Sequence, residues 1–238
     1  MDIITSLAIV AFAALIHASF QLSVGVLSLM SGHALSAKKS RARLLHLTTS
    51  YTIGAGVMTM LVLSFVSLIF LHAFRDGVPL LVWALACGLV LGIGIAVWLF
   101  YYRRNGNGAE LWIPRSFADH LHKRSKATHH GAEAFSLGLT SVMAELLFII
   151  PSLTISALVL LELPGVWQLV GIAVYTLISL IGLFIAWSFI GSGHSLARVQ
   201  KWRVENKRFL QFAAGGALIV LGFFVYVSKI MTTLSGAI

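Results

Sequence analysis

The stretch Ala134–Leu161, AFSLGLTSVMAELLFIIPSLTISALVLL, decides the fold of this chain. It exceeds the roughly 20 apolar residues that an α-helix needs to cross a bilayer. Its one charged side chain is Glu145. A carboxylate surrounded by hydrocarbon is energetically costly and usually has a function. The stretch therefore predicts a transmembrane helix that carries a functional acid.

Five other apolar stretches of similar length surround this one in the sequence. The chain has 238 residues, of which 58% are hydrophobic and only 11% charged, whereas a soluble domain has about 25% charged residues. These features predict an all-α polytopic membrane protein with a single transmembrane domain over residues 1–238. Its six transmembrane helices are expected at residues 3–31, 44–74, 78–102, 134–161, 166–191 and 209–228.

The basic residues predict the orientation of the chain. Four Lys or Arg lie in residues 38–43, six in 103–126 and five in 198–208, which makes 15 of the 17 in the sequence. By the positive-inside rule these three segments are cytoplasmic and both termini face outward. We expect the plasma (inner) membrane of a bacterial-type cell. The formal charge of +9 fits contact with anionic lipid headgroups on the cytoplasmic face and does not call for a nucleic acid.

A polar loop at residues 103–133 divides the chain into two halves of three helices each. Such a layout is common in secondary transporters. The third predicted helix carries small residues at four-residue spacing, at Ala84, Gly88, Gly92 and Ala96. Small residues let a second helix approach closely. The sequence leaves open whether that helix belongs to the same protomer or to a second copy in a homodimer.

Glu145 is the leading candidate for a substrate or proton pathway. If its helix enters hydrocarbon near Phe135, ten residues at 1.5 Å each place Glu145 about 15 Å deep. Burial there favours the neutral acid at rest, which could titrate when a cation or proton arrives. Pro151 frees the carbonyl of Leu147 from its helical hydrogen bond, and Ser141 lies one turn before Glu145 on the same face.

His17 is the natural partner of Glu145. Counted from Ile4, it lies about 20 Å into the first span, again near the bilayer centre. Gln21 follows one turn later, and Thr52 adds a hydroxyl from the second span. A His–Glu pair at matched depth could relay protons or hold a polar substrate. The alternative is that these side chains form hydrogen bonds that only hold the helices together.

The sequence gives little support for a metal site or a cofactor. His120, His122, His129 and His130 are metal-ligating in type, but their spacing matches no zinc signature, so we expect a wetted basic loop and no cofactor. The single cysteine, Cys87, excludes two-cysteine redox chemistry within the chain. The sequence has no nucleophile–base pair of the kind that indicates an enzyme, so we do not expect an enzyme.

Two motifs resemble the lysine-exporter superfamily of six-helix transporters. They are Phe135-Ser-Leu-Gly138-Leu-Thr, entering the helix before Pro151, and Arg208-Phe-Leu followed by Gly215-Gly216 and Leu221-Gly222. That superfamily includes amino-acid exporters, divalent-metal exporters and cysteine-bearing electron conduits. This chain lacks the cysteine pair of the conduits and an acidic metal motif on its first helix. The resemblance therefore implies a solute exporter and assigns no site residue.

Two functional hypotheses follow. The first is a secondary transporter that exports a small polar or cationic solute, coupled to protons through Glu145, with a divalent-metal exporter as a variant. The second is a membrane scaffold or assembly subunit whose polar residues lock its helices together.

Overall fold

The computed structural model describes residues 1–20, 38–75, 77–101, 124–125, 128, 130–193, 201–202 and 205–235. Within these residues the ordered elements are all helical, which confirms the predicted all-α fold class. They are α1 (Ile3–Ser19), α3 (Lys38–Ala73), α4 (Leu80–Tyr101), α6 (Gly131–Leu161), α7 (Gly165–Ser179), α8 (Ile181–Gly191), α10 (Lys207–Val225), the π-helix η1 (Tyr226–Met231) and α11 (Thr232–Ser235).

Three stretches of helix are each long and apolar enough to cross a membrane unaided: Arg41–Ala73, Leu80–Leu99 and Arg208–Ser235. Two bent pairs, α6 with its bend and α7 with α8, raise the number to five if each pair is one span. The remaining apolar helix, α1, has 17 residues. The described residues thus contain three to five candidate spans, fewer than the six predicted.

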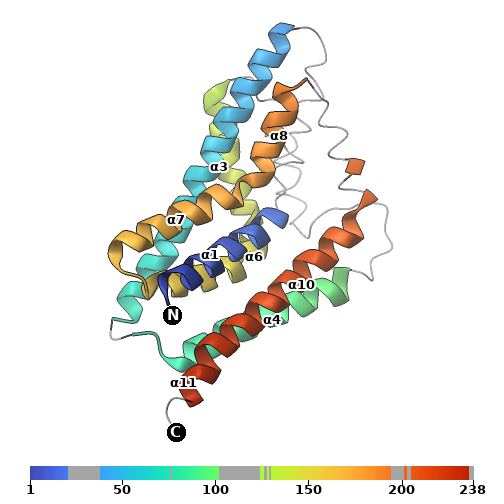
Figure 1. Ribbon diagram of the computed structural model, residues 1–238. Helices are drawn as coiled ribbons and strands as arrows, with labels where there is room; N and C mark the ends of the chain where they lie inside the picture. Colours follow the sequence, from blue (N-terminus) through green and yellow to red (C-terminus); the bar gives the residue numbers. More distant parts are fainter. Residues whose placement is uncertain are drawn as a thin grey trace.

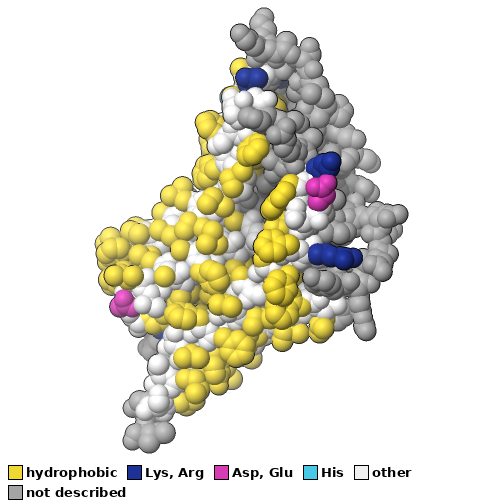
Figure 2. Space-filling model, turned by 45° about the vertical axis from the view of Figure 1, so that its right-hand side comes forward, with side chains coloured by type: hydrophobic (Ala, Val, Ile, Leu, Met, Phe, Trp, Pro, Cys, Tyr) yellow, Lys and Arg dark blue, Asp and Glu magenta, His cyan; other side chains and the backbone are white. Residues whose placement is uncertain are grey.

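The surface of these helices is apolar, as a membrane environment requires. Large side chains such as Phe65, Leu81, Leu99, Leu169 and Phe209 are each more than half exposed. Apolar side chains cover much of the described part of the face drawn in Figure 2, and few charged side chains are in view there. A soluble monomer rarely exposes a continuous apolar surface of this extent.

The helices form two groups. In the larger group α3 packs along α6, and α1 lies between α6 and α7 (Figure 1). In the smaller group α4 and α10 run side by side, and η1 continues α10 along α4. The two groups meet where α1 contacts α10 and where α4 contacts α6.

Two glycines allow α3 and α6 to touch backbone to backbone. A Cβ added at Gly138 would overlap the carbonyl oxygen of Tyr51, and one added at Gly54 would overlap the carbonyl oxygen of Phe135. Each glycine thus faces the main chain of the other helix, the close approach that small residues permit in membranes. This contact holds α6 in place on the N-terminal side of Glu145.

The small-residue face predicted on the third helix does not form the contact between α4 and α10. A Cβ at Gly88 or Gly92 would have no described atom within 4 Å. The contact between α4 and α10 instead uses Gly94, whose Cβ would lie 3.0 Å from the carbonyl oxygen of Gly215. Because Gly94 lies two residues beyond Gly92, it faces another side of the helix.

Two predicted spans bend near their centres: the fourth by 88° between Leu146 and Phe148, and the fifth by 48° at Leu180. In the first predicted span, α1 ends at Ser19, and residues 21–31 lie outside the described residues. The bend in α6 coincides with the carbonyl that Pro151 frees, as the sequence indicated. At the other bend the Ser179 hydroxyl donates to the carbonyl of Thr176, and such back-bonding often bends helices.

The last predicted span is longer than expected. The charged residue Lys229 predicts an end at residue 228. The helix instead continues through η1 and α11 to Ser235. Lys229 can stay within it because its ammonium group pairs with Glu162. The helix of the second span begins at Lys38, before the predicted residue 44, and its membrane-spanning stretch begins at Arg41.

Candidate functional site

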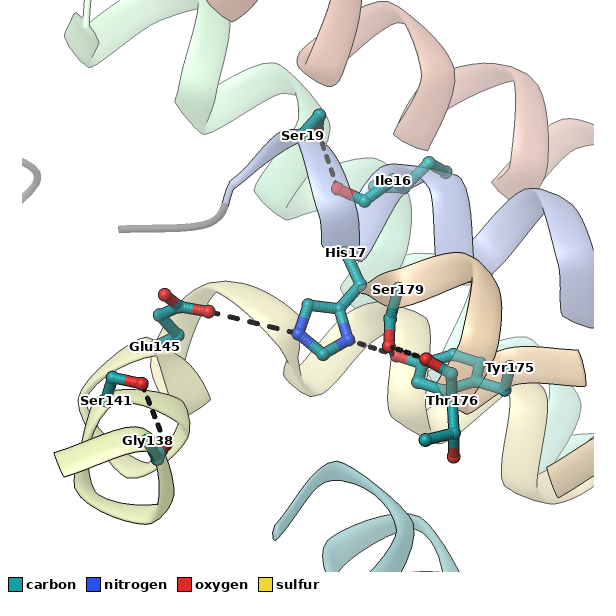
Figure 3. A network of polar contacts seen from close by, with 9 residues as sticks. All are labelled: Ile16, His17, Ser19, Gly138, Ser141, Glu145, Tyr175, Thr176 and Ser179. Atoms are coloured by element: carbon teal, nitrogen blue, oxygen red, sulfur yellow. Dashed lines mark hydrogen bonds and ion pairs between the residues drawn. The ribbon is translucent and has the colours of Figure 1, made fainter. Parts of the chain in front are cut away.

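His17 and Glu145 form a buried pair inside the bundle. The Nε2 atom of His17 lies 3.9 Å from an Oε atom of Glu145, and each side chain is only 1% exposed. Figure 3 shows the two side chains pointing toward each other from α1 and α6. The expectation that they lie close together in the interior is therefore confirmed. Their functional roles remain predictions.

Tyr175 completes the site from the other side of the imidazole. Its hydroxyl lies 3.1 Å from Nδ1 of His17, and its ring, which is fully buried, is tilted 45° against the imidazole (Figure 3). Tyr175 is not among the pathway residues predicted from the sequence. Its signal is a tyrosine in the middle of an apolar helix, because membrane tyrosines usually lie at the interface with water.

The contacts on both ring nitrogens link the protonation of His17 to its neighbours. A neutral imidazole has one donor and one acceptor nitrogen. If Tyr175 donates to Nδ1, then Nε2 carries its hydrogen toward the Glu145 carboxylate. If Nδ1 donates to Tyr175, then Nε2 can accept a proton from the Glu145 carboxylic acid. The arrangement therefore supports both positions of a proton shared by His17 and Glu145.

The separation of the pair matters for proton transfer. At 3.9 Å the nitrogen and oxygen are within ion-pair reach but beyond hydrogen-bond length. Transfer needs a small approach of the two side chains or one bridging water. Burial disfavours the charged forms of both groups. A proton or cation that arrives here therefore changes which forms of the two side chains are favoured.

All three elements that supply these residues end or bend beside the site. His17 lies in the last turn of α1, Glu145 two residues before the bend of α6, and Tyr175 one turn before the bend between α7 and α8. Interrupted helices leave backbone groups without intrahelical partners, and membrane proteins use such groups to line sites for ions and substrates.

The other predicted pathway residues contribute less directly. The Ser141 hydroxyl donates to the carbonyl of Gly138, and the Thr52 hydroxyl donates to the carbonyl of Thr48. Both are buried, but their hydrogens are used within their own helices, so any role would be as acceptors. Pro151 is buried in α6, four residues beyond the centre of the bend. Gln21 lies outside the described residues.

The candidate metal ligands do not assemble in the part of the chain that the structure describes. His130 is exposed at the start of α6, where its backbone N–H donates to the Glu133 carboxylate at 3.1 Å. His120, His122 and His129 lie outside the described residues. Among those described, no group of three or more His, Cys, Asp or Glu could hold a metal ion.

No protein-family model, curated protein or solved structure matches this chain.

Replacing Tyr175 with Phe should let His17 adopt both neutral tautomers while the fold is retained. The variant loses one hydroxyl, and a hydrogen bond contributes about 1 kcal/mol to stability. In ¹⁵N solid-state NMR we expect His17 to change from one dominant tautomer to a mixture, with its signal assigned by comparison with His17→Asn. Tyr226→Phe, at a partly exposed tyrosine, is the control. An unchanged His17 spectrum in the Tyr175 variant would show that the hydroxyl does not orient the imidazole.

Proposed function

We propose that this protein is a secondary transporter that exports a small polar or cationic solute in exchange for protons. The observation that carries the proposal is the buried Glu145–His17 pair, which lies where α1 ends and where α6 and the α7–α8 pair bend. Acidic residues buried at membrane depth are characteristic of ion and substrate pathways, and discontinuous helices are characteristic of transporter binding sites.

The proposed coupling is a competition for Glu145. With a proton bound, the acid is neutral and fits its buried surroundings. A cationic solute that enters the site favours the carboxylate and so releases the proton, which His17 can accept at Nε2. Because the same side chain binds either the proton or the cation, the two would move in opposite directions across the membrane.

We also propose six spans, with α1 as the first, in a bacterial-type inner membrane. Its 17 residues cover about 26 Å as a helix, less than the hydrocarbon thickness of roughly 30 Å, so the proposed first span extends beyond Ser19. The lysine-exporter resemblance, cytoplasmic contact with anionic headgroups and a homodimer belong to the same proposal. The open face at Gly88 and Gly92 is compatible with a second copy.

Cysteine labelling tests the orientation. In a Cys87→Ser background, Val166→Cys should react with an impermeant maleimide added outside intact cells, and Lys201→Cys should react only after the cells are opened. Both native side chains are well exposed, so neither site is blocked by packing. Labelling of Lys201→Cys from outside would invert the topology that the basic residues predict.

The transport proposal is tested with purified protein in liposomes that contain a pH-sensitive dye. We expect a cationic probe, L-lysine, or a neutral polar probe, L-serine, to drive proton movement across the membrane. Proton movement driven by Mn²⁺ alone would favour the metal-exporter variant. If none of these probes and no wider solute panel moves protons above the level of empty liposomes, the scaffold hypothesis takes precedence.

A further inference from the structure

A second charged pair lies away from the Glu145 site, between the end of α6 and the π-helix η1. The ammonium group of Lys229 donates to the carboxylate of Glu162. The Lys229 side chain is only 11% exposed and that of Glu162 is 31% exposed. By contrast, the Lys201–Glu205 pair is 77% and 58% exposed. Exposed pairs of that kind contribute little to stability, whereas removing one partner of a buried pair is strongly destabilising.

Trp83 gives this pair a third contact. The Nζ atom of Lys229 lies 5.2 Å from the centre of the Trp83 ring, within the range of a cation–π interaction. Trp83 comes from the first turn of α4 and is itself buried. The ammonium group therefore joins three segments that are far apart in the sequence.

The location of the contact gives it mechanical importance. Trp83 and Lys229 belong to the smaller helix group, and Glu162 closes the C-terminal end of α6 in the larger group. The contact lies at the ends of the helices opposite the basic segments, which the charge asymmetry assigns to the outside. It therefore fastens the α4–α10 pair to the rest of the bundle at one membrane surface.

The helix that carries Lys229 departs from α-helical geometry at this point. Residues Tyr226–Met231 form a π-helix, a rare, wide-turned form that often marks functional sites. Returning this segment to α-helical geometry would remove one extra residue from the turn. The residues that follow would rotate by about 100° relative to those before the segment, the angle of one residue in an α-helix. Because Lys229 lies inside the segment, the same change would shift its ammonium group relative to Glu162.

We propose that Glu162, Lys229 and Trp83 form a latch that holds the outer end of the bundle closed and releases when η1 changes its turn. The latch is independent of the Glu145 chemistry. The latch controls the opening of the contact between the two helix groups, whatever solute the protein handles.

The chain contains its own reporter for this opening. Cys87, the sole cysteine, is buried on α4 one turn after Trp83. Cys87 lies on the side of α4 that packs on α10, since Gly94, seven residues later, faces Gly215. A hydrophilic maleimide should reach it only when α4 separates from its neighbours near the latch. The experiment measures the rate of Cys87 labelling in purified full-length protein in detergent, so it requires no substrate and no transport activity.

We expect Lys229→Met and Glu162→Gln to label roughly tenfold faster than the wild type or more, since each removes one charge of a partly buried pair. The reversed pair, Glu162→Lys with Lys229→Glu, should restore slow labelling in part. Lys201→Met, which breaks the exposed pair, is the matched control and should label at the wild-type rate. Glu162→Gln keeps nearly the same volume, so it provides a measurement if Lys229→Met does not fold.

Two results would overturn the latch. One is wild-type labelling rates in the folded single variants. The other is a reversed pair that labels as fast as the singles, which would mean that the substitutions loosen the bundle without any specific release. Either result leaves the transport proposal standing, and a failure of the flux assay leaves the latch standing.

Discussion

Glu145→Gln should reduce proton-coupled flux to the level of empty liposomes while the protein remains folded. The amide has nearly the volume of the acid and mimics its neutral form, so the contact with His17 loses its exchangeable proton but little packing. Wild-type flux should depend on pH, because Glu145 must both bind and release a proton. The Gln variant cannot ionise, so its residual flux should show no dependence on pH through this site. The measurement is solute-driven proton movement in liposomes across a range of pH.

Two comparison variants make this result specific. Glu205→Gln changes an exposed carboxylate and should leave both the rate and the pH profile unchanged. Glu145→Ala should be less stable than the Gln variant, because it leaves a cavity and removes hydrogen-bonding capacity from a buried site. If wild-type and Gln proteins have the same rate and the same pH profile, Glu145 serves only to join helices, and the scaffold hypothesis gains support.

Gly138→Ala should destabilise the protein strongly, although alanine is the better helix former. The new Cβ would overlap the carbonyl oxygen of Tyr51 and lie 2.9 Å from the amide nitrogen of Ala55. Both atoms belong to the main chain of α3, which cannot move aside as a flexible side chain would. Overpacking of this kind costs about 2–3 kcal/mol. Unfolding in mixed detergent micelles, followed by tryptophan fluorescence, measures the loss.

Gly88→Ala is the matched control for this substitution. It makes the same chemical change within a membrane helix, at a position with no described atom within 4 Å of the added Cβ. Its stability should be unchanged or higher by up to about 1 kcal/mol, the helix propensity gained on replacing glycine. Equal stability of the two variants would contradict the backbone contact between α3 and α6. A large loss at Gly88 would indicate that a second copy packs on that face.

The sequence predicted the helical fold and the central pair because both depend on the cost of burying polar groups in hydrocarbon. Continuous apolar stretches have few alternatives to helices at that length. His17 and Glu145 could be paired by depth alone, since each needs a polar neighbour. Pro151 also indicated where α6 would break.

Other features depend on three-dimensional packing that a linear pattern does not contain. The bend after Ser179 has no proline, and its hydroxyl bond to Thr176 is one of many such bonds in straight helices. Tyr175 is unusual for its place in the middle of an apolar helix, but the sequence does not show that its hydroxyl meets His17. As a charged residue, Lys229 predicted the end of a helix. Its partner Glu162 is 67 residues away in the sequence, so the sequence did not show that the charge would be paired. For the same reason the contact of Gly94 with Gly215 could not be separated from the open face at Gly88.

The hydrogen bond between His17 and Tyr175, which spans 158 positions, has a consequence for biosynthesis. During translation His17 enters the membrane long before Tyr175 has been made, and Glu145 follows with its own helix still incomplete. Until α7 is inserted, the nascent chain carries these polar side chains without their final arrangement, a costly state in lipid. Ribosome-bound chains that stop short of Tyr175 should therefore depend on the insertion machinery or a chaperone to shield them. Completion of α7 is the step at which the chain can leave that protection.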